Sequence, residues 1–154
     1  YVIGYKDGSV RPCGLVSRAE ATTIFFRLLK DEVRDGNLVT SNTYTDVPDG
    51  YWANTAISTM TELGIVKGRS ANTFDPKAPI TRAQFAVICA RFDTGESSGT
   101  QTFSDIKGHW AEQYIERAAE LGQGDHLDDI LPHVSRMTAQ FFAIHEKAPF
   151  CLPL

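Results

Sequence analysis

Two arginines occupy the same position in two matching stretches of the sequence. The stretches Ser17-Arg18-Ala19-Glu20 and Thr81-Arg82-Ala83-Gln84 both fit the capping box S/T-x-x-E/Q, so each arginine is predicted at the first position of a helix. Backbone amides and the positive end of the helix dipole favour an anion at this place. A guanidinium adds a two-pronged contact to a planar anion. We therefore expect Arg18 and Arg82 to hold anionic groups, and a salt bridge to a neighbouring carboxylate is the alternative.

These two stretches belong to an internal repeat. A shift of 64 residues places 2–20 on 66–84 without a gap, and a shift of 58 places Trp52-Ala53 on Trp110-Ala111. The repeating unit is about 55–64 residues long. Such units share a core with their neighbours, because one helix pair alone cannot bury its apolar face.

Each unit is predicted to be a helix, a loop and a second helix. Ala53, Ala56, Ile57 and Met60 follow helical spacing, and Ala111, Tyr114, Ile115 and Ala118 repeat it. The helices behind the capping boxes carry the stripes Ala21, Ile24, Phe25, Leu28 and Phe85, Ile88, Cys89, Phe92. Gly64 follows a helix end, and Gly4, Gly8, Gly68 and Asn72 lie in loops, where glycine and asparagine tolerate positive φ. Val10 and Phe74 are predicted to be short extended plugs into the core.

Composition excludes several classes of protein. The chain has 154 residues, 42% of them hydrophobic, and a net charge of −4. It contains no apolar run of about 18 residues, so no membrane-spanning helix is expected, and a general nucleic-acid binder would normally carry a basic face. Three distant cysteines do not make a disulfide framework, and the scattered histidines predict no zinc site. We expect no cofactor, no metal and no catalysis, and we interpret a chain that starts at Tyr1 as a fragment or a processed form.

The motifs resemble S-layer homology repeats of bacterial cell-surface proteins. They recur in a fixed order, as aromatic-x-Asp, Trp-Ala, Leu-Gly-Ile and Thr-Arg-Ala, in 44–53, 63–68 and 80–85, and partly again in 103–111. The resemblance divides the chain into the back half of a first repeat (1–35), a linker (36–43), a complete second repeat (44–92), a linker (93–102), a degenerate third repeat (103–148) and an apolar tail (149–154).

The resemblance implies an all-α, pseudo-threefold assembly of helix-loop-helix repeats with short extended loop segments. It also implies a non-catalytic anchor, outside the cell at the wall or S-layer, that binds secondary cell-wall polysaccharide with or without pyruvyl ketals. Other surface-layer chains are further candidate partners, and neither nucleic acid nor membrane insertion is expected. The ligand-binding residues implied in the grooves between repeats are Arg18, Arg82, Asp46, Asp105, Trp52, Trp110, Gly4, Gly68 and Lys6.

Several of these residues have a structural alternative. Trp52 and Trp110 either stack on sugar faces or anchor the core, which the apolar stripe behind each of them favours. Asp46 and Asp105 either bind ligand or cap a helix or turn.

The third repeat can be aligned with the others in two registers. Aligning Arg136 with Arg18 keeps the arginine but buries Glu146, whereas aligning Phe141 with Phe85 leaves no arginine at that position. We prefer the second register, because burying a charge is costly. The degenerate third repeat leaves a second function open, a structural interaction module that keeps the fold without binding glycan.

Overall fold

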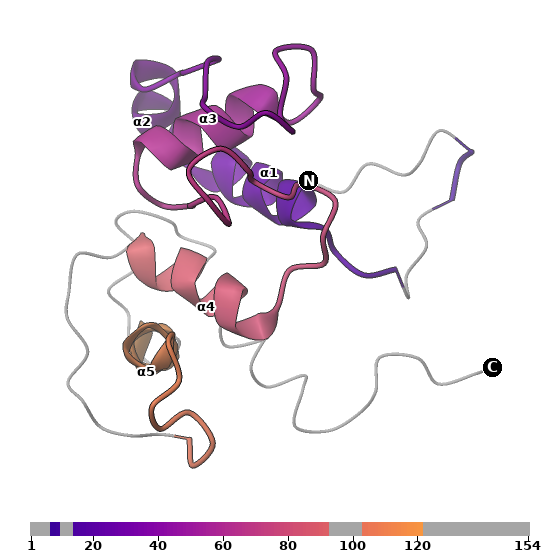
Figure 1. Ribbon diagram of the computed structural model, residues 1–154. Helices are drawn as coiled ribbons and strands as arrows, with labels where there is room; N and C mark the ends of the chain where they lie inside the picture. Colours follow the sequence, from indigo (N-terminus) through magenta and orange to yellow (C-terminus); the bar gives the residue numbers. More distant parts are fainter. Residues whose placement is uncertain (1–6, 10–13, 93–102, 122–154) are drawn as a thin grey trace.

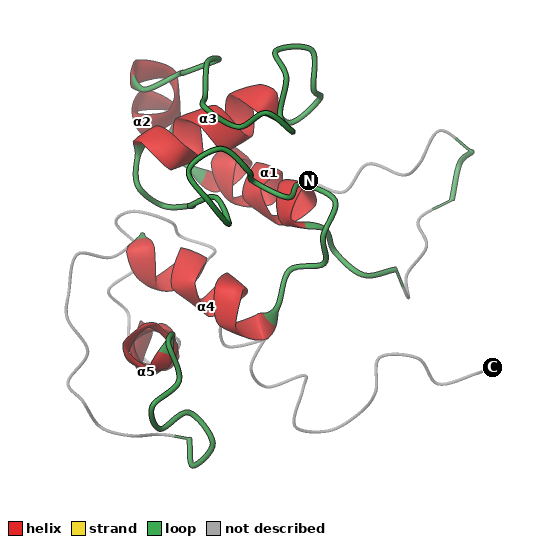
Figure 2. Ribbon diagram, viewed as in Figure 1, coloured by secondary structure: helices red, strands yellow, loops and turns green. Residues whose placement is uncertain are grey.

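The computed structural model describes residues 7–9, 14–92 and 103–121, and these residues form helices joined by loops (Figures 1 and 2). The helices are α1 (Arg18–Leu28), α2 (Asp31–Gly36), α3 (Asn54–Glu62), α4 (Arg82–Arg91) and α5 (Glu112–Leu121). Extended pairing in this part of the chain is limited to two isolated bridges, Ser17 with Pro79 and Ser70 with Thr73. The all-α prediction is confirmed for the described residues, and the pseudo-threefold arrangement stays a prediction.

Both predicted capping boxes are present. At the start of α1, Ser17 Oγ accepts a hydrogen bond from the Glu20 amide at 3.2 Å, and Glu20 Oε2 accepts one from the Ser17 amide at 2.8 Å. At the start of α4, Thr81 and Gln84 exchange the same two hydrogen bonds at 3.2 and 3.1 Å. Each box satisfies amides that the helix itself leaves without partners, so the sequence defines where both helices begin.

The apolar face predicted for the first helix of the second repeat is the buried face of α3. Ala53, Ala56, Ile57 and Met60 are all at most 4% exposed. α3 ends at Glu62, and Gly64, just beyond it, has a φ of 72°, the left-handed conformation that glycine adopts without strain. The amides of Ile65 and Val66 then donate to the Met60 carbonyl, which turns the chain back toward the core.

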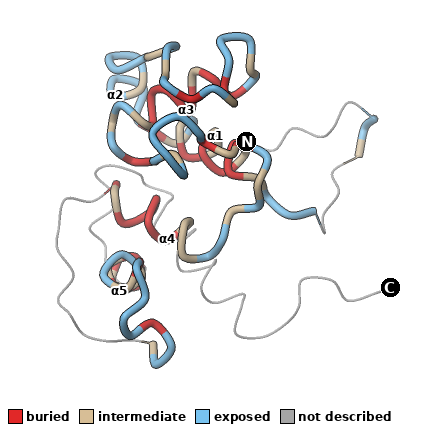
Figure 3. The backbone as a smooth tube through the Cα atoms, in the orientation of Figure 1, coloured by how far each residue is buried: buried red, intermediate tan, exposed pale blue. Residues whose placement is uncertain are grey.

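The core joins the first and second repeats. Phe25 of α1 is fully buried, and its ring lies 5.1 Å from that of Phe85 and 5.5 Å from that of Phe92. Phe74 is also buried, at 1% exposure, which confirms its predicted role as a plug, whereas Val10 lies outside the described residues. Burial of each such ring stabilises the fold by ~1.5–3 kcal/mol. α1 packs on α3 and α4 packs on α5, and Figure 3 shows buried segments along α1, α3 and α4.

The loop before α4 is hydrogen-bonded to the start of α1. The Ile80 amide donates to the Val16 carbonyl at 2.9 Å, and the Arg18 and Ala19 amides donate to the Ala78 and Pro76 carbonyls at 2.9 and 3.0 Å. Two stretches about 60 residues apart in the sequence therefore meet directly. This contact places the start of α1 beside the loop of the second repeat.

The segment between the first two repeats is more structured than its composition predicts. The short helix α2, which the sequence did not indicate, ends at Gly36, the first residue of the predicted linker 36–43. Within that linker, the Val39 amide donates to Thr59 Oγ1 of α3 at 3.0 Å.

Both registers proposed for the third repeat concern residues outside those described. In the described part of the chain, no helix has the length and apolar character needed to cross a membrane.

Candidate ligand-binding pocket

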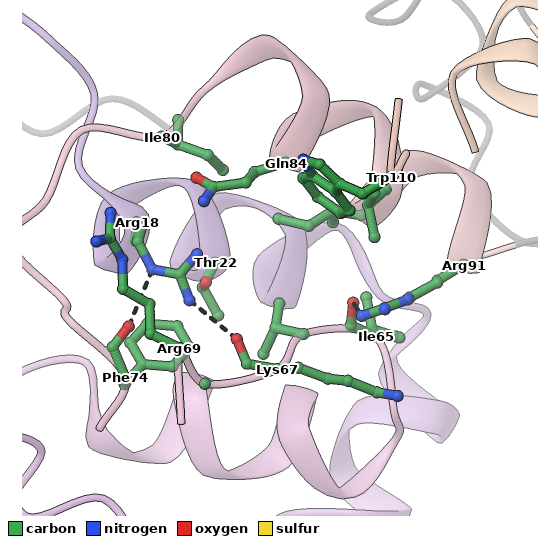
Figure 4. A pocket seen from close by; sticks show the side chains of 14 residues that line it. Arg18, Thr22, Ile65, Lys67, Arg69, Phe74, Ile80, Gln84, Arg91 and Trp110 are labelled. Atoms are coloured by element: carbon green, nitrogen blue, oxygen red, sulfur yellow. Dashed lines mark hydrogen bonds between the residues drawn. The ribbon is translucent and has the colours of Figure 1, made fainter. Parts of the chain in front are cut away.

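A pocket of about 290 Å³ opens where parts of all three repeats meet (Figure 4). Its walls come from α1, from the loop that follows α3, from α4, and from the turn that precedes α5. The lining residues that carry the argument below are Arg18, Thr22, Lys67, Gly68, Arg69, Phe74, Gln84, Arg91 and Trp110.

The charged residues of this lining are all cationic. They are Arg18, Lys67, Arg69 and Arg91, and no described residue of the lining is an aspartate or glutamate. The chain as a whole carries a net charge of −4, so this concentration of positive charge is local. Such a pocket attracts an anionic group over short distances, without long-range steering by the rest of the molecule.

Arg18 lies at the inner wall of the pocket and is 8% exposed. Its Nε donates to the Phe74 carbonyl at 3.0 Å and its Nη2 to the Lys67 carbonyl at 2.9 Å, as Figure 4 shows. The guanidinium carbon also lies 4.6 Å from the centre of the Phe74 ring, a cation–π contact. Burial, followed by the like charge of Arg69, lowers the pKa of Arg18 below its usual value.

The backbone at the start of α1 differs from the sequence prediction. That prediction relied on amides available to an anion, but the Arg18 and Ala19 amides donate to carbonyls of the second-repeat loop. The next amide, of Glu20, donates to Ser17 Oγ. The helix start is therefore used for packing between repeats. The alternative for Arg18 is a salt bridge to a carboxylate. The described hydrogen bonds of its side chain instead go to two backbone carbonyls.

Arg82 occupies the equivalent position in α4 but a different environment. It is the first residue of that helix, as predicted, and it is exposed. It does not belong to the lining of the pocket that contains Arg18. The two arginines thus share a local motif without sharing a site.

Asp46 fixes the end of the loop 67–74, which supplies part of the pocket lining. Its Oδ1 accepts a hydrogen bond from the Phe74 amide at 2.9 Å, and its Oδ2 accepts one from the Asp75 amide at 2.7 Å. Asp75 has a φ of 61°, unusual for a residue other than glycine, and these two hydrogen bonds support that conformation. Asp46 therefore caps a turn, one of the two roles that the sequence left open.

Gly68 is required by close packing and not by positive φ, which neither Gly68 nor Asn72 adopts. A Cβ at Gly68 would lie 2.5 Å from Tyr44 Cε1 and 2.6 Å from the Ser70 carbonyl oxygen. The Gly68 amide donates to the Tyr44 hydroxyl at 3.0 Å. Only a residue without a side chain allows the loop to approach the buried tyrosine so closely. At Gly8, by contrast, φ is 79°, in the region that glycine tolerates.

Both tryptophans are at the surface, so the core-anchor alternative is wrong. Trp52 is 61% exposed and Trp110 is 62% exposed. The alanine that follows each ring is buried at no more than 1% exposure, and these alanines occupy the core positions. Trp110 lies at the pocket, and Trp52 is not part of its lining. The remaining predicted residues are Asp105, which is exposed, and Gly4 and Lys6, which lie outside the described residues.

Three cationic residues of the pocket were not predicted as site residues. Lys67 and Arg69 flank Gly68 in the loop, and Arg91 is the last residue of α4. Lys67 is part of the recurring motif in 63–68, and this recurrence is the sequence signal that could have marked it as a site residue. Arg91 lies on α4 with Gln84 and Ile88 of the lining but 22 residues after Arg69, so only the fold places it beside the other cations of the pocket.

The newly found arginines also contact their surroundings. Arg69 Nε lies 3.1 Å from Asp75 Oδ2, and the Arg69 side chain remains more than half exposed. Arg91 Nη1 donates to the Ile65 carbonyl at 3.2 Å, and the guanidinium lies 5.4 Å from the centre of the Tyr114 ring of α5. Arg91 therefore links α4, the loop and the third repeat at one side of the pocket.

Cys89 is a core residue, as the sequence predicted. Its side chain is fully buried in α4, and burial raises the pKa of its thiol far above the usual value. A thiol in this state is not a nucleophile. Among residues 7–9, 14–92 and 103–121, no group of three or more His, Cys, Asp or Glu side chains is arranged to hold a metal ion.

The described residues form a helical module with a cationic pocket where parts of the three repeats meet. The family model of the S-layer homology domain matches residues 43–86 and 102–122. The chain belongs to the S-layer homology domain family, and the resemblance of its motifs is confirmed.

Similar proteins are surface proteins of bacteria. The chain is 37% identical over 134 residues to Cell surface glycoprotein 1 of Acetivibrio thermocellus, a match that covers 79% of this chain and 6% of that protein. It is 36% identical over 129 residues to a Cellulosome-anchoring protein of the same organism, covering 79% of this chain and 29% of that protein. An S-layer protein of Bacillus licheniformis is 29% identical over 154 residues, covering 95% of this chain and 17% of that protein. The chain thus spans a small part of the length of each.

These findings establish a coarse function. The chain is an extracellular module of the cell surface, and its family and its anchoring relatives indicate a non-catalytic anchoring role. Some relatives have enzyme names, such as the Amylopullulanase of Thermoanaerobacterium thermosulfurigenes, but this chain covers only 7% of that protein.

Proposed function

We propose that this module attaches a surface protein to the bacterial wall by binding secondary cell-wall polysaccharide, with cationic side chains between the repeats holding anionic pyruvyl ketal groups. The observation that supports the proposal is the pocket itself, in which Arg18, Lys67, Arg69 and Arg91 meet and no described lining residue carries a carboxylate. Arg82 is proposed to serve a separate groove at the start of α4.

The shape and lining of the pocket suit one or two sugar units with a carboxylate. Trp110 offers an exposed indole face at the pocket, and an aromatic ring of this kind packs against the apolar face of a pyranose. Gln84 and Thr22 add uncharged side chains that hydrogen-bond hydroxyl groups. A ketal carboxylate is small and planar, and guanidinium groups bind such a group more specifically than an ammonium does.

The direct test is calorimetric titration of the chain with wall polysaccharide, native and after mild acid removal of the ketals. We expect the native glycan to bind and the treated glycan to bind at least tenfold more weakly. Arg91→Gln and Lys67→Gln remove cations from the pocket and should each weaken binding to the native glycan by about tenfold, the loss of one charge-assisted contact. Lys77→Gln is the matched control, because Lys77 is an exposed cation of the neighbouring loop outside the pocket lining.

Two other results would contradict the proposal in different ways. Equal binding of native and ketal-free glycan would show that the anionic group is not what the pocket recognises. No binding of either glycan by the folded chain would favour the structural interaction module, in which the repeats associate with other surface-layer chains.

A further inference from the structure

We infer that Arg18 is a positioning residue, which fastens the loop of the second repeat to α1, and that the ligand carboxylate is held by the more accessible cations Lys67, Arg69 and Arg91. The part that concerns the ligand rests on the proposed function. The part that concerns the loop is independent of it and is tested without any glycan.

The donors of Arg18 are committed inside the protein. Nε and Nη2 carry the N–H groups along one edge of the guanidinium, the edge that would grip a carboxylate side-on. Nε donates to the Phe74 carbonyl at 3.0 Å and Nη2 to the Lys67 carbonyl at 2.9 Å. One edge of the guanidinium is therefore occupied by backbone acceptors of the second repeat.

The position of Arg18 also favours a structural role. The side chain is 8% exposed, and its guanidinium packs against the buried Phe74 ring. A ligand that displaced the two carbonyls would leave them buried without partners, which costs free energy. The start of α1 offers no compensation, because the Arg18 and Ala19 amides are bonded to Ala78 and Pro76.

The carbonyls that Arg18 holds mark the two ends of the cationic loop. Lys67 begins the loop and Phe74 ends it, and Arg69 lies between them. The same loop is fixed by the Tyr44 hydroxyl at the Gly68 amide and by Asp46 at the Phe74 amide. Tyr44 and Asp46 belong to the second repeat, so Arg18 is the residue by which the first repeat holds this loop.

The other cations are placed to meet a ligand. Lys67 and Arg69 are exposed, and Arg91 is partly exposed. In Figure 4, Lys67 and Arg91 extend toward one side of the pocket, whereas Arg69 runs beside Arg18 at the other. A ligand carboxylate can reach Lys67 and the N–H groups of Arg69 and Arg91 other than those that contact Asp75 Oδ2 and the Ile65 carbonyl, while the two carbonyls bound by Arg18 stay paired.

The experiment compares Arg18→Gln with Arg91→Gln, using Lys77→Gln as the control for charge. Amide hydrogen exchange across 67–75 and thermal unfolding are measured without glycan, and titration with native wall polysaccharide follows at low and at high salt. We expect Arg18→Gln to speed exchange in the loop at least tenfold and to lower the Tm by about 5 °C or more. Lys77→Gln should leave loop exchange within twofold of the wild-type rate. Arg91→Gln, which loses the hydrogen bond to the Ile65 carbonyl, should speed exchange across 67–75 less than Arg18→Gln does, weaken glycan binding about tenfold and reduce its salt dependence.

One outcome overturns the inference: Arg18→Gln keeps the wild-type loop exchange and Tm but no longer binds glycan. This result would make Arg18 a direct ligand contact. If Arg18→Gln does not fold, Arg18→Lys, which keeps the charge without the planar fork, is examined in the same way, and wild-type loop exchange in that variant also overturns the inference. If the wild-type chain binds no glycan, the proposed function fails, and loop exchange still decides the role of Arg18.

Discussion

Asp46 and Phe74 are joined by a hydrogen bond from the Phe74 amide to Asp46 Oδ1 at 2.9 Å, although 28 residues separate them in the sequence. Through its other oxygen, Asp46 also holds the next amide, that of Asp75. One carboxylate thereby fixes the end of the loop whose other residues line the pocket. The Phe74 carbonyl, on the far side of the same residue, accepts the hydrogen bond from Arg18.

Replacement of Asp46 by asparagine is expected to destabilise the fold. An amide side chain has an NH₂ group in place of the second oxygen, so one of the two backbone amides would face a donor instead of an acceptor. The expected loss is about 1–3 kcal/mol in the free energy of unfolding. Urea unfolding of Asp46→Asn measures it, and Asp105→Asn, a change at the exposed aspartate of the matching motif, is the control. Equal losses in the two variants would contradict the role assigned to Asp46.

Replacement of Gly68 by alanine is expected to disrupt the loop. The added Cβ would lie 2.5 Å from Tyr44 Cε1 and 2.7 Å from the Thr73 carbonyl oxygen, so the tyrosine or the loop must move. Overpacking of this kind costs about 1–3 kcal/mol. Gly50→Ala is the matched control, because a Cβ there meets nothing within 4 Å and the φ of Gly50 is not positive. Thermal unfolding should separate the two variants, and a Gly68→Ala chain as stable as Gly50→Ala would show that the close approach is not required.

The sequence predicted best those features that depend on neighbouring residues. Both capping boxes, the left-handed Gly64 after α3 and the buried stripe Ala53, Ala56, Ile57 and Met60 follow from spacing within a few residues, and the structure confirms them. The matching stripe of α5 is confirmed only in part, because Tyr114 is exposed. The amides at the start of α1 show the limit of such local reasoning. The motif indicated available donors, but the partners of Arg18 and Ala19 come from residues 76–78, and nothing near Ser17 encodes that contact.

The candidate site was predicted only in part for the same reason. Arg18 and Trp110 were identified from repeated motifs, whereas Arg91 reaches the pocket because α4 packs on α5 and lies beside the loop after α3. For the two tryptophans, the local pattern favoured burial, but both rings are exposed. An apolar stripe follows each of them, yet the buried residue is the next one, Ala53 or Ala111, and the larger ring remains outside.

Trp110→Ala is expected to lower glycan affinity without lowering stability. Its ring is 62% exposed, so its removal costs little packing, and a sugar that stacks on it loses an apolar contact. We expect about a tenfold weaker Kd in calorimetric titration and a Tm close to that of the wild type. Trp52→Ala, which removes an equally exposed ring outside this pocket, should change binding at this pocket less. A Trp110→Ala chain with wild-type affinity would exclude stacking at this position.

Cys89 should make the fold less stable in alkali. Burial raises the pKa of its thiol, so the folded chain keeps the proton when the unfolded chain, with a thiol pKa near the usual 9.0, loses it. The contribution is fully present below pH 9 and falls by up to ~1.4 kcal/mol per pH unit above it. Urea unfolding at pH 7.5 and pH 10, with Cys13 and Cys151 replaced by serine, measures this loss. Cys89→Ala in that background should lose less stability between the two pH values, and an equal loss would show that Cys89 ionises while folded.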